Sequence, residues 1–208
     1  MGRPRVPLIS RRRALEVALE IIDTDGIECL SIRNLADRLK VTGASLYHHF
    51  ENKQEIVLGA ARLALEGAYA PRHDDEPWRI WMVRSARRLR QALRDHPDLA
   101  SVILHRQPLG IGLAYGTAHE DATVALLAAE DIPTGAVAPI LEALELYAIG
   151  SALHETLGGA ERTDEPAGGS HLAEAVARRA VSPDEVFELV CEKIIDSVLA
   201  IAAEPQAR

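Results

Sequence analysis

The chain has 208 residues, enough for one large hydrophobic core or two modest ones. Aromatic side chains make up only 4% of it, and Ala, Leu, Glu and Arg dominate, a composition that predicts an all-α protein. No apolar run approaches the roughly 18 residues that a membrane-spanning helix needs, and the first residues lack the apolar segment of a signal peptide. We therefore expect a cytoplasmic protein with no membrane partner.

The net charge of −8 argues against a nucleic-acid partner, but its distribution argues for one. Residues 1–53 contain nine basic and seven acidic side chains, a net charge of +2, so the rest of the chain must carry −10. Five of the nine are arginines that precede residue 14, with no acid among them. A basic N-terminal segment followed by an acidic remainder indicates that a polyanion binds at one end only.

Two cysteines, Cys29 and Cys191, lie far apart and in no CxxC or Cys/His spacing. This spacing indicates neither a disulfide framework nor a zinc site, and buried thiols are the simplest interpretation. We expect neither a bound metal nor a cofactor.

Apolar residues recur with helical spacing over residues 10–25, between a capping serine and Gly26. A second helix of about two turns follows Ser31. The next residues, KVTG, predict a turn at Gly43 with Thr42 as the cap of the third helix.

The third segment, ASLYHHF, places Leu46 and Phe50 on one side of a short helix. Its other residues face outward: Ser45, Tyr47, His48 and His49. Asn52 caps a fourth helix that continues to about Ala70.

The polar segment 71–77, PRHDDEP, predicts a connector between two domains. Beyond it, helices are expected over residues 78–94, 97–105, 117–131, 134–157 and 183–202, with a mobile loop over 158–169. Ser182, Pro183 and Glu185 form the start signal of the last helix.

Three short helices with a tight turn between the second and third, behind a basic segment, match the helix-turn-helix module. The run LSIRNLADRLKVTGASLYHHFENKQEIVLGA resembles the DNA-binding signature of the tetracycline-repressor family. The likeness lies in an S-x-R-x-L-A second helix, a V-x-x-x-x-L-Y-x-H-F recognition element and an N-K pair that opens the next helix. It implies a DNA-binding domain with a basic N-terminal arm over 1–53, a connecting helix over 54–70, and a helical ligand-binding and dimerisation domain over 71–208.

The predicted DNA-binding residues are Arg11, Arg33, Thr42, Gly43, Ala44, Ser45, Tyr47, His48, His49 and Lys53. The four from Thr42 to Ser45 are short enough for a helix N-terminus to approach base edges. The resemblance implies phosphate contacts for Tyr47 and His49, and a base or backbone contact for His48. Lys53 and Arg33 place charge where phosphates pass.

Arg11 belongs to an arm, residues 3–13, that we expect to order along phosphates or in a minor groove.

Other interpretations of these residues stay open. The Tyr47 ring could pack against the helix-turn-helix core while its hydroxyl reaches a phosphate. Arg33 could pair with Asp37 one turn later. A metal site at His48 and His49 is disfavoured, because adjacent side chains on a helix diverge by about 100°.

Three later segments, HPDLASVILHRQP, ELYAIGSALHE and EVFELVCEKIIDSVL, are similar to the ligand-binding domain of the tetracycline repressors themselves. In that subgroup a histidine helps to hold a metal-bound drug, and Ile103 stands in its place here, with His105 two residues on. His105 is equally explained as an ordinary polar residue. The predicted pocket residues are Trp81, Met82, Ile103, His105, Leu113, Tyr115, Leu144 and Tyr147, any of which could instead be plain core.

The last helix carries an apolar stripe: Val186, Leu189, Val190, Ile194, Val198 and Ile201. Gly150 and Ser151 on the preceding helix permit close approach. The resemblance implies a four-helix bundle built by two subunits, while a stripe that serves only the monomer core is the alternative.

These features predict a homodimeric transcriptional regulator, a repressor that a small hydrophobic inducer releases from a palindromic double-stranded DNA operator. The alternative is a helical carrier of hydrophobic ligands without regulatory DNA binding. An enzyme is not expected, because the chain has no GxSxG, phosphate-binding loop or HExxH.

Overall fold

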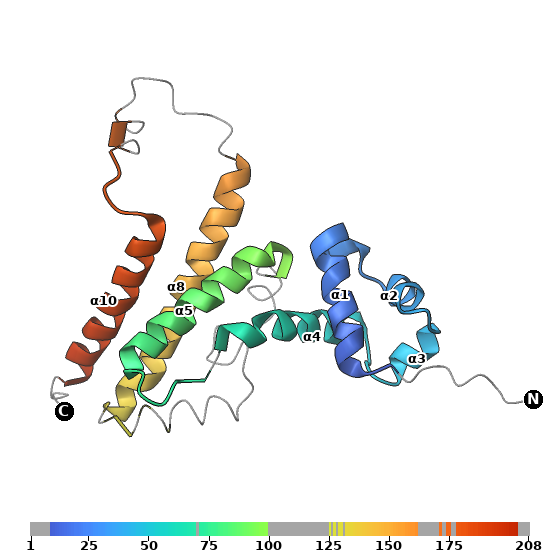
Figure 1. Ribbon diagram of the computed structural model, residues 1–208, viewed down its shortest axis with the longest axis horizontal. Helices are drawn as coiled ribbons and strands as arrows, with labels where there is room; N and C mark the ends of the chain where they lie inside the picture. The colour runs from blue at the N-terminus through green and yellow to red at the C-terminus, as the bar shows by residue number, and fades with distance from the viewer. Residues whose placement is uncertain are drawn as a thin grey trace, which may run out of the picture.

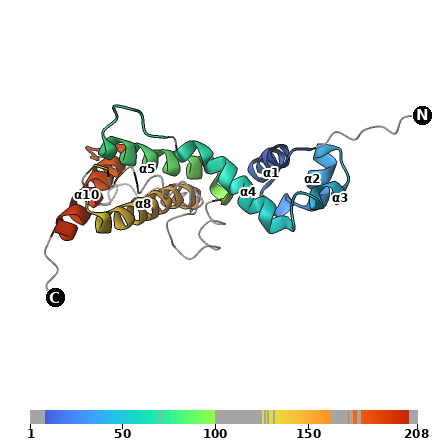
Figure 2. The ribbon, with the colours of Figure 1, turned by 90° about the horizontal axis from the view of Figure 1, so that it is seen from below.

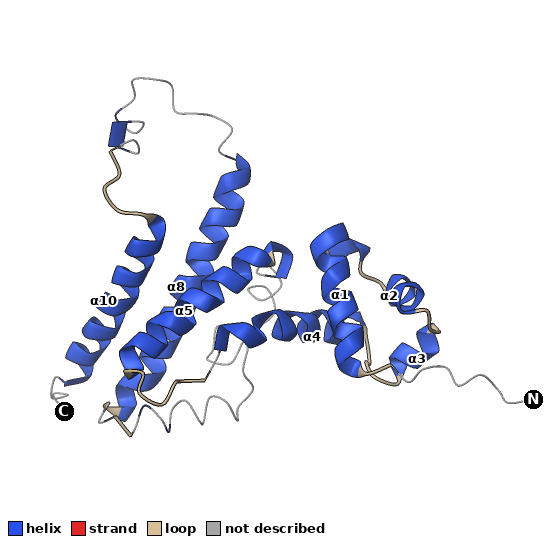
Figure 3. Cartoon of the chain, viewed as in Figure 1, coloured by secondary structure: helices blue, strands red, loops and turns tan. Residues whose placement is uncertain are grey.

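The computed structural model describes residues 9–69, 71–99, 132–161 and 178–203, together with residues 125, 127, 129–130, 171 and 174–175. Within these residues every regular element is a helix and no strand occurs (Figure 3). The helices form two groups (Figure 1), which we call the N-terminal unit, residues 9–69, and the C-terminal unit, residues 71–99, 132–161 and 178–203. The all-α prediction is confirmed.

The N-terminal unit consists of α1 (Arg11–Asp25), the 3-10 turn η1 (Ile27–Cys29), α2 (Ile32–Leu39), α3 (Gly43–Tyr47) and α4 (Lys53–Leu65). Its core includes Ala18, Ile21, Leu35, Leu46, Phe50 and Ile56. All four α-helices begin with a side-chain oxygen that accepts a hydrogen bond from a backbone N–H three residues on: Ser10 from Arg13 (3.1 Å), Ser31 from Asn34 (3.1 Å), Thr42 from Ser45 (3.3 Å) and Asn52 from Glu55 (3.0 Å). These caps satisfy donors that a helix start leaves free.

The turn between α2 and α3 differs from the sequence prediction. Gly43 is the first residue of α3, and a Cβ there would meet only ordinary contact with Ile32 at 3.6 Å. The left-handed residue is Lys40, with φ 56° and ψ 44°, whose N–H bonds to carbonyls at the end of α2. The helix therefore ends on a lysine in the conformation that glycine normally takes.

α4 leads from the N-terminal unit toward the C-terminal unit and lies against α1 (Figure 2). A Cβ at Gly59 would fall 2.6 Å from Cδ2 of Leu15, so the glycine lets these two helices approach closely. α4 ends at Leu65 and continues as the 3-10 segment η2 (Glu66–Tyr69), whereas the sequence predicted one helix to residue 70.

The C-terminal unit packs α5 (Trp78–Asp95), α8 (Thr134–Glu161) and α10 (Pro183–Ala203) side by side. The predicted start signal of α10 is confirmed: Ser182 accepts a hydrogen bond from the N–H of Glu185 at 3.2 Å and donates its own N–H to that carboxylate at 2.8 Å. Of the helix predicted over 97–105, residues 97–99 are helical. Its remainder and most of the helix predicted over 117–131 lie outside the described residues.

α8 departs from the sequence prediction in two ways. It continues through Gly158 and Gly159 to Glu161, because a glycine costs only about 1 kcal/mol in a helix already formed. The first four residues of the predicted loop are therefore helical, and the rest of that loop lies outside the described residues. Within the part of the chain that the structure describes, it is also the one helix long and apolar enough to cross a membrane, over Thr134–Thr156. The expectation that no apolar run is long enough to span a membrane is therefore wrong. Of the most apolar stretch of α8, 39% is buried within this single chain.

α10 buries one face and exposes part of the predicted apolar stripe. Phe187, Cys191 and Ile195, spaced four residues apart, form the buried face. Val186, Leu189 and Ile201 of the stripe are 38%, 53% and 71% exposed. The monomer-core alternative is therefore wrong for these three residues, and Leu146 on α8 is likewise 46% exposed.

Arg90 of α5, only 3% exposed, joins all three helices of the C-terminal unit. Its guanidinium donates to Glu155 of α8 and, at 2.7 Å, to Asp184 of α10. It also lies 4.6 Å from the ring centroid of Phe187, which stacks on Tyr147 at 5.0 Å. A charge this deeply placed is held by its two carboxylates and the ring together.

Replacing Arg90 by Ala removes its hydrogen bonds to Glu155 and Asp184, while Arg94 stays paired with Glu155 at 3.2 Å. The free energy of unfolding should fall by about 2 kcal/mol. Arg87→Ala is the matched control, because its pair with Glu188 is exposed and worth at most about 1 kcal/mol. Urea unfolding at fixed protein concentration measures both. Equal losses would show that the contacts of Arg90 contribute no more to stability than an exposed ion pair.

The expectation of buried thiols is confirmed for Cys191 and wrong for Cys29. Cys191 is buried, and burial raises its pKa to about 12, whereas Cys29 is exposed in η1. Since the thiolate is the nucleophile, a disulfide reagent at neutral pH should label Cys29 in the native protein and reach Cys191 only after unfolding. Rapid native labelling of Cys29→Ser would contradict this assignment.

Candidate DNA-binding interface and ligand site

The outer face of α3 carries the predicted base contacts. Leu46 is fully buried and fixes the inner face, so the opposite side points to solvent. Thr42 and Ala44 are exposed there, while Gly43 and Ser45 are half-buried. The hydroxyls of Thr42 and Ser45 are hydrogen-bonded at 2.9 Å. The first turn of α3 thus presents short side chains and two hydroxyls, which can donate to or accept from base edges.

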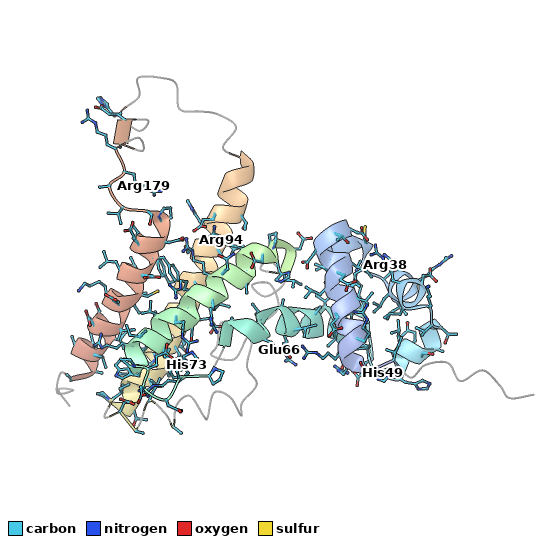
Figure 4. The ribbon with its side chains drawn as sticks, viewed as in Figure 1. Arg38, His49, Glu66, His73, Arg94 and Arg179 are labelled. Carbon is cyan, nitrogen blue, oxygen red and sulfur yellow. The ribbon has the colours of Figure 1, made fainter. Side chains whose placement is uncertain are left out.

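The residues after this turn divide between surface and core. Tyr47 is 59% exposed, so the alternative in which its ring packs in the core is wrong. His48 is exposed. His49, labelled in Figure 4, is half-buried. Its ring meets the Phe50 ring edge-on at 6.4 Å. Among the described residues, no three His, Cys, Asp or Glu side chains are grouped to hold a metal ion.

Two cations flank α3 at the positions that the sequence predicted. Lys53 opens α4, is exposed, and places Nζ 3.5 Å from the carbonyl of Ile27. Arg33 is exposed on the first turn of α2, and within the described residues it forms no ion pair with Asp37. Both charges are therefore available to a phosphate backbone.

The basic arm is shorter than predicted. Arg11, Arg12 and Arg13 belong to α1, because Ser10 caps that helix, and each has carboxylate partners. Arg11 bonds to Glu55 at 2.6 Å and to the carbonyl of His49, so the prediction that a loose arm extends through it is wrong. Arg3 and Arg5 lie outside the described residues.

The predicted ligand residues are only partly placed. Trp81, Met82 and Leu144 are buried in the core of the C-terminal unit, on α5 and α8. Tyr147 is half-buried, and desolvation raises the pKa of its hydroxyl. Four others lie outside the described residues: Ile103, His105, Leu113 and Tyr115.

A second contact between the two units, separate from α4, was not expected from the sequence. The end of α5 lies beside the end of α1 (Figure 1), where Asp98 accepts a hydrogen bond from the N–H of Ile27 at 3.2 Å. Nδ1 of His96 lies 2.8 Å from Oδ1 of Asp23. A cavity of about 150 Å³ opens at this junction, lined by Ile22, Asp23, Gly26, Asp95, Pro97 and Asp98. These contacts join residues 71 and 73 positions apart, so no local pattern predicts them.

The connector 71–77 is held by Glu76. Its carboxylate accepts two hydrogen bonds from Arg84 of α5, at 2.7 and 2.6 Å, and this pairing lowers the pKa of Glu76. Arg72 donates to the Glu76 carbonyl at 2.6 Å and to Glu130 at 2.5 Å. The path from α4 into α5 is therefore fixed by ion pairs.

This architecture is shared with known proteins. Residues 14–60 match the family model described as bacterial regulatory proteins of the tetR family, and residues 70–200 match the model of the tetracyclin repressor-like C-terminal domain. An HTH-type transcriptional regulator of Saccharopolyspora erythraea is 30% identical over 177 residues, 83% of this chain and 71% of that protein. The class A tetracycline repressor from transposon 1721 of Escherichia coli is 29% identical over 88% of both chains.

Solved structures agree with this assignment. A single-residue variant of TetR from Acinetobacter baumannii AYE, in complex with minocycline, superposes with a TM-score of 0.78 at 22% identity over 96% of this chain and 98% of that one, a likeness of fold. ActR from Streptomyces coelicolor, in complex with actinorhodin, gives 0.68 at 27% identity over 94% and 99%. The chain belongs to the TetR family of bacterial regulatory proteins and is a helix-turn-helix transcriptional regulator.

Proposed function

We propose that this regulator is a repressor that binds a palindromic operator as a homodimer and leaves it when a small hydrophobic ligand occupies the C-terminal unit. The observation that carries the proposal is the outer face of α3, where Tyr47 is 59% exposed above a buried Leu46. The alternative is a carrier of hydrophobic ligands. Ligand carriage does not require a polar, solvent-facing α3 between two capped helices, whereas DNA binding does. As a regulator acting on DNA, the protein works in the cytoplasm, and we assign it no catalytic role.

The contacts divide into phosphate and base contacts. Tyr47, Lys53 and Arg33 position the N-terminal unit on phosphates, because their polar ends are exposed on three different elements. Base edges meet the first turn of α3 through Thr42, Gly43, Ala44 and Ser45, together with His48. We assign His49 a phosphate contact as well, with its ring also meeting Phe50 edge-on.

Dimerisation uses the outer face of α8 and α10. Leu146, Val186 and Leu189 are exposed there in the single chain, and a Cβ at Gly150 would meet no atom within 4 Å. A second copy would bury this apolar surface and bring four helices together. It also supplies the second α3, which must lie about 34 to 36 Å from the first to enter the next major groove.

The ligand acts through the C-terminal unit, with Trp81, Met82, Leu144 and Tyr147 as described wall residues and with Ile103, His105, Leu113 and Tyr115 as further candidates. Two structural relatives were solved with minocycline and with actinorhodin. A ligand that moves the end of α5 would disturb the Asp98–Ile27 and His96–Asp23 contacts and so shift α1. Release requires only that the ligand bind the shifted state more tightly.

Lys53→Gln tests the DNA interface. If Lys53 neutralises one phosphate, a plot of log association constant against log salt should lose about 0.9 from its slope, with weaker binding at every sequence. Arg179→Gln is the control, because Arg179 lies at the far end of the C-terminal unit (Figure 4). The probe is the duplex upstream of the regulator's own gene. An unchanged slope for Lys53→Gln would contradict the assigned contact.

Ligand response separates the repressor from the carrier. Titrating minocycline and actinorhodin, then further hydrophobic aromatic compounds, should identify one that abolishes DNA binding. Operator DNA should weaken the binding of that compound by the same factor, because linkage is reciprocal. Ligand affinity unaffected by DNA would favour the carrier.

A further inference from the structure

Arg11, the first residue of α1, contacts the segment that joins α3 to α4. Its Nη1 donates to the carbonyl of His49, and its Nη2 donates to Oε1 of Glu55 at 2.6 Å. Its guanidinium carbon lies 4.6 Å from the centroid of the Phe50 ring. One side chain therefore holds a backbone acceptor, a carboxylate and an aromatic face that are 38 to 44 residues away in sequence.

Glu55 closes the same segment from the other side. Its second oxygen accepts the backbone N–H of Glu51 at 2.7 Å, and its own N–H donates to the side chain of Asn52 at 3.0 Å. The Glu51 N–H and Arg11 together lower the pKa of this carboxyl, so it is ionised at neutral pH. Residues 49–55 are thus tied to α1 by a charge-assisted pair between Arg11 and Glu55.

This segment lies between the groups proposed to touch DNA. Tyr47 and His48 precede it, and Lys53 opens the helix after it. Leu46 and Phe50 are buried and set which face of α3 points inward, but neither of them ties the polar segment between Phe50 and Lys53 to α1. The planar guanidinium of Arg11 does so, because it bonds to the His49 carbonyl and the Glu55 carboxylate at once.

The neighbouring arginines do not do this. Arg13 pairs with Glu16 at 3.2 Å and Glu20 at 3.6 Å, both on its own helix. Arg12 reaches Glu16 and, beyond the end of α4, Glu66.

We infer that Arg11 is a positioning residue for operator binding, which acts through Glu55 and the His49 carbonyl and is not itself a phosphate ligand. The inference rests on the proposed function, because it names the side chain that holds the same surface in place. It also replaces the sequence-based assignment of Arg11 as a direct DNA contact.

The two roles predict opposite effects of Glu55→Gln. If Arg11 bound phosphate, removing its carboxylate partner would free the cation and tighten DNA binding. If Arg11 positions the segment, Glu55→Gln should weaken binding about tenfold, as for loss of one charge-assisted hydrogen bond.

The experiment is a double-mutant cycle on the full chain: Arg11→Gln, Glu55→Gln and both together, with Arg13→Gln as the matched control and the upstream duplex as probe. Each single variant should weaken binding about tenfold with an unchanged salt slope, and the double variant should be no weaker than either. A slope reduced by about 0.9 in Arg11→Gln, or tighter binding by Glu55→Gln, would overturn the inference.

Arg11→Lys tests the role of Arg11 without removing its charge. It keeps the charge but loses the planar fork, so a positioning role predicts a loss close to that of Gln, whereas a phosphate contact predicts near-normal binding. Hydrogen exchange of residues 49–55 in DNA-free protein gives a readout independent of the operator. Faster exchange in Arg11→Gln than in Arg13→Gln is expected. Equal exchange would show that Arg11 does not hold residues 49–55 in place. Failure of wild-type protein to bind DNA would reject the proposed function alone.

Discussion

Everything in the DNA-binding surface depends on burying one side of a five-residue helix. A helix as short as α3 has no stability of its own in water. It persists because Leu46 is fully buried, Phe50 is 2% exposed, and Thr42 caps its first turn. α2 packs against α3, and Arg11 of α1 contacts the segment that follows it, at the His49 carbonyl and the Phe50 ring. The polar side chains of α3 can then face outward in a defined order, which a base-reading element requires.

The C-terminal unit is also held together by burying one face of each helix, but its helices are longer. α5, α8 and α10 share a core, and Arg90 joins them where α10 begins and α8 nears its end. The exposed apolar face of α8 and α10 has no partner among the described residues of the chain, which fits a family whose members act in pairs. Contacts at Asp98 and His96, beside the continuous path through α4, mean that movement of α5 reaches α1 directly. A ligand would therefore have two routes to the DNA-binding surface.

Much of the N-terminal unit could be predicted, because its signals are local. Ser10, Ser31, Thr42 and Asn52 were recognisable as caps, and the exposed positions of α3 follow from its apolar spacing. The roles of Lys40, Arg11 and Arg90 could not be predicted. Lys40 takes a conformation that favours glycine, so the residue pattern pointed to Gly43 instead. Arg11 and Arg90 find their carboxylates 44 and 65 residues away, and only the tertiary fold brings those groups together. The stripe on α10 was identified, but its buried neighbour Phe187 was not.

We propose that two copies of this chain place two α3 helices in successive major grooves. Selection of duplexes from a random pool by the purified full-length protein, followed by sequencing, tests it for any operator sequence. We expect enrichment of an inverted repeat whose half-site centres lie about 10 base pairs apart or a multiple of that spacing. Enrichment of a single, unrepeated motif, or of nothing above the starting pool, would contradict it.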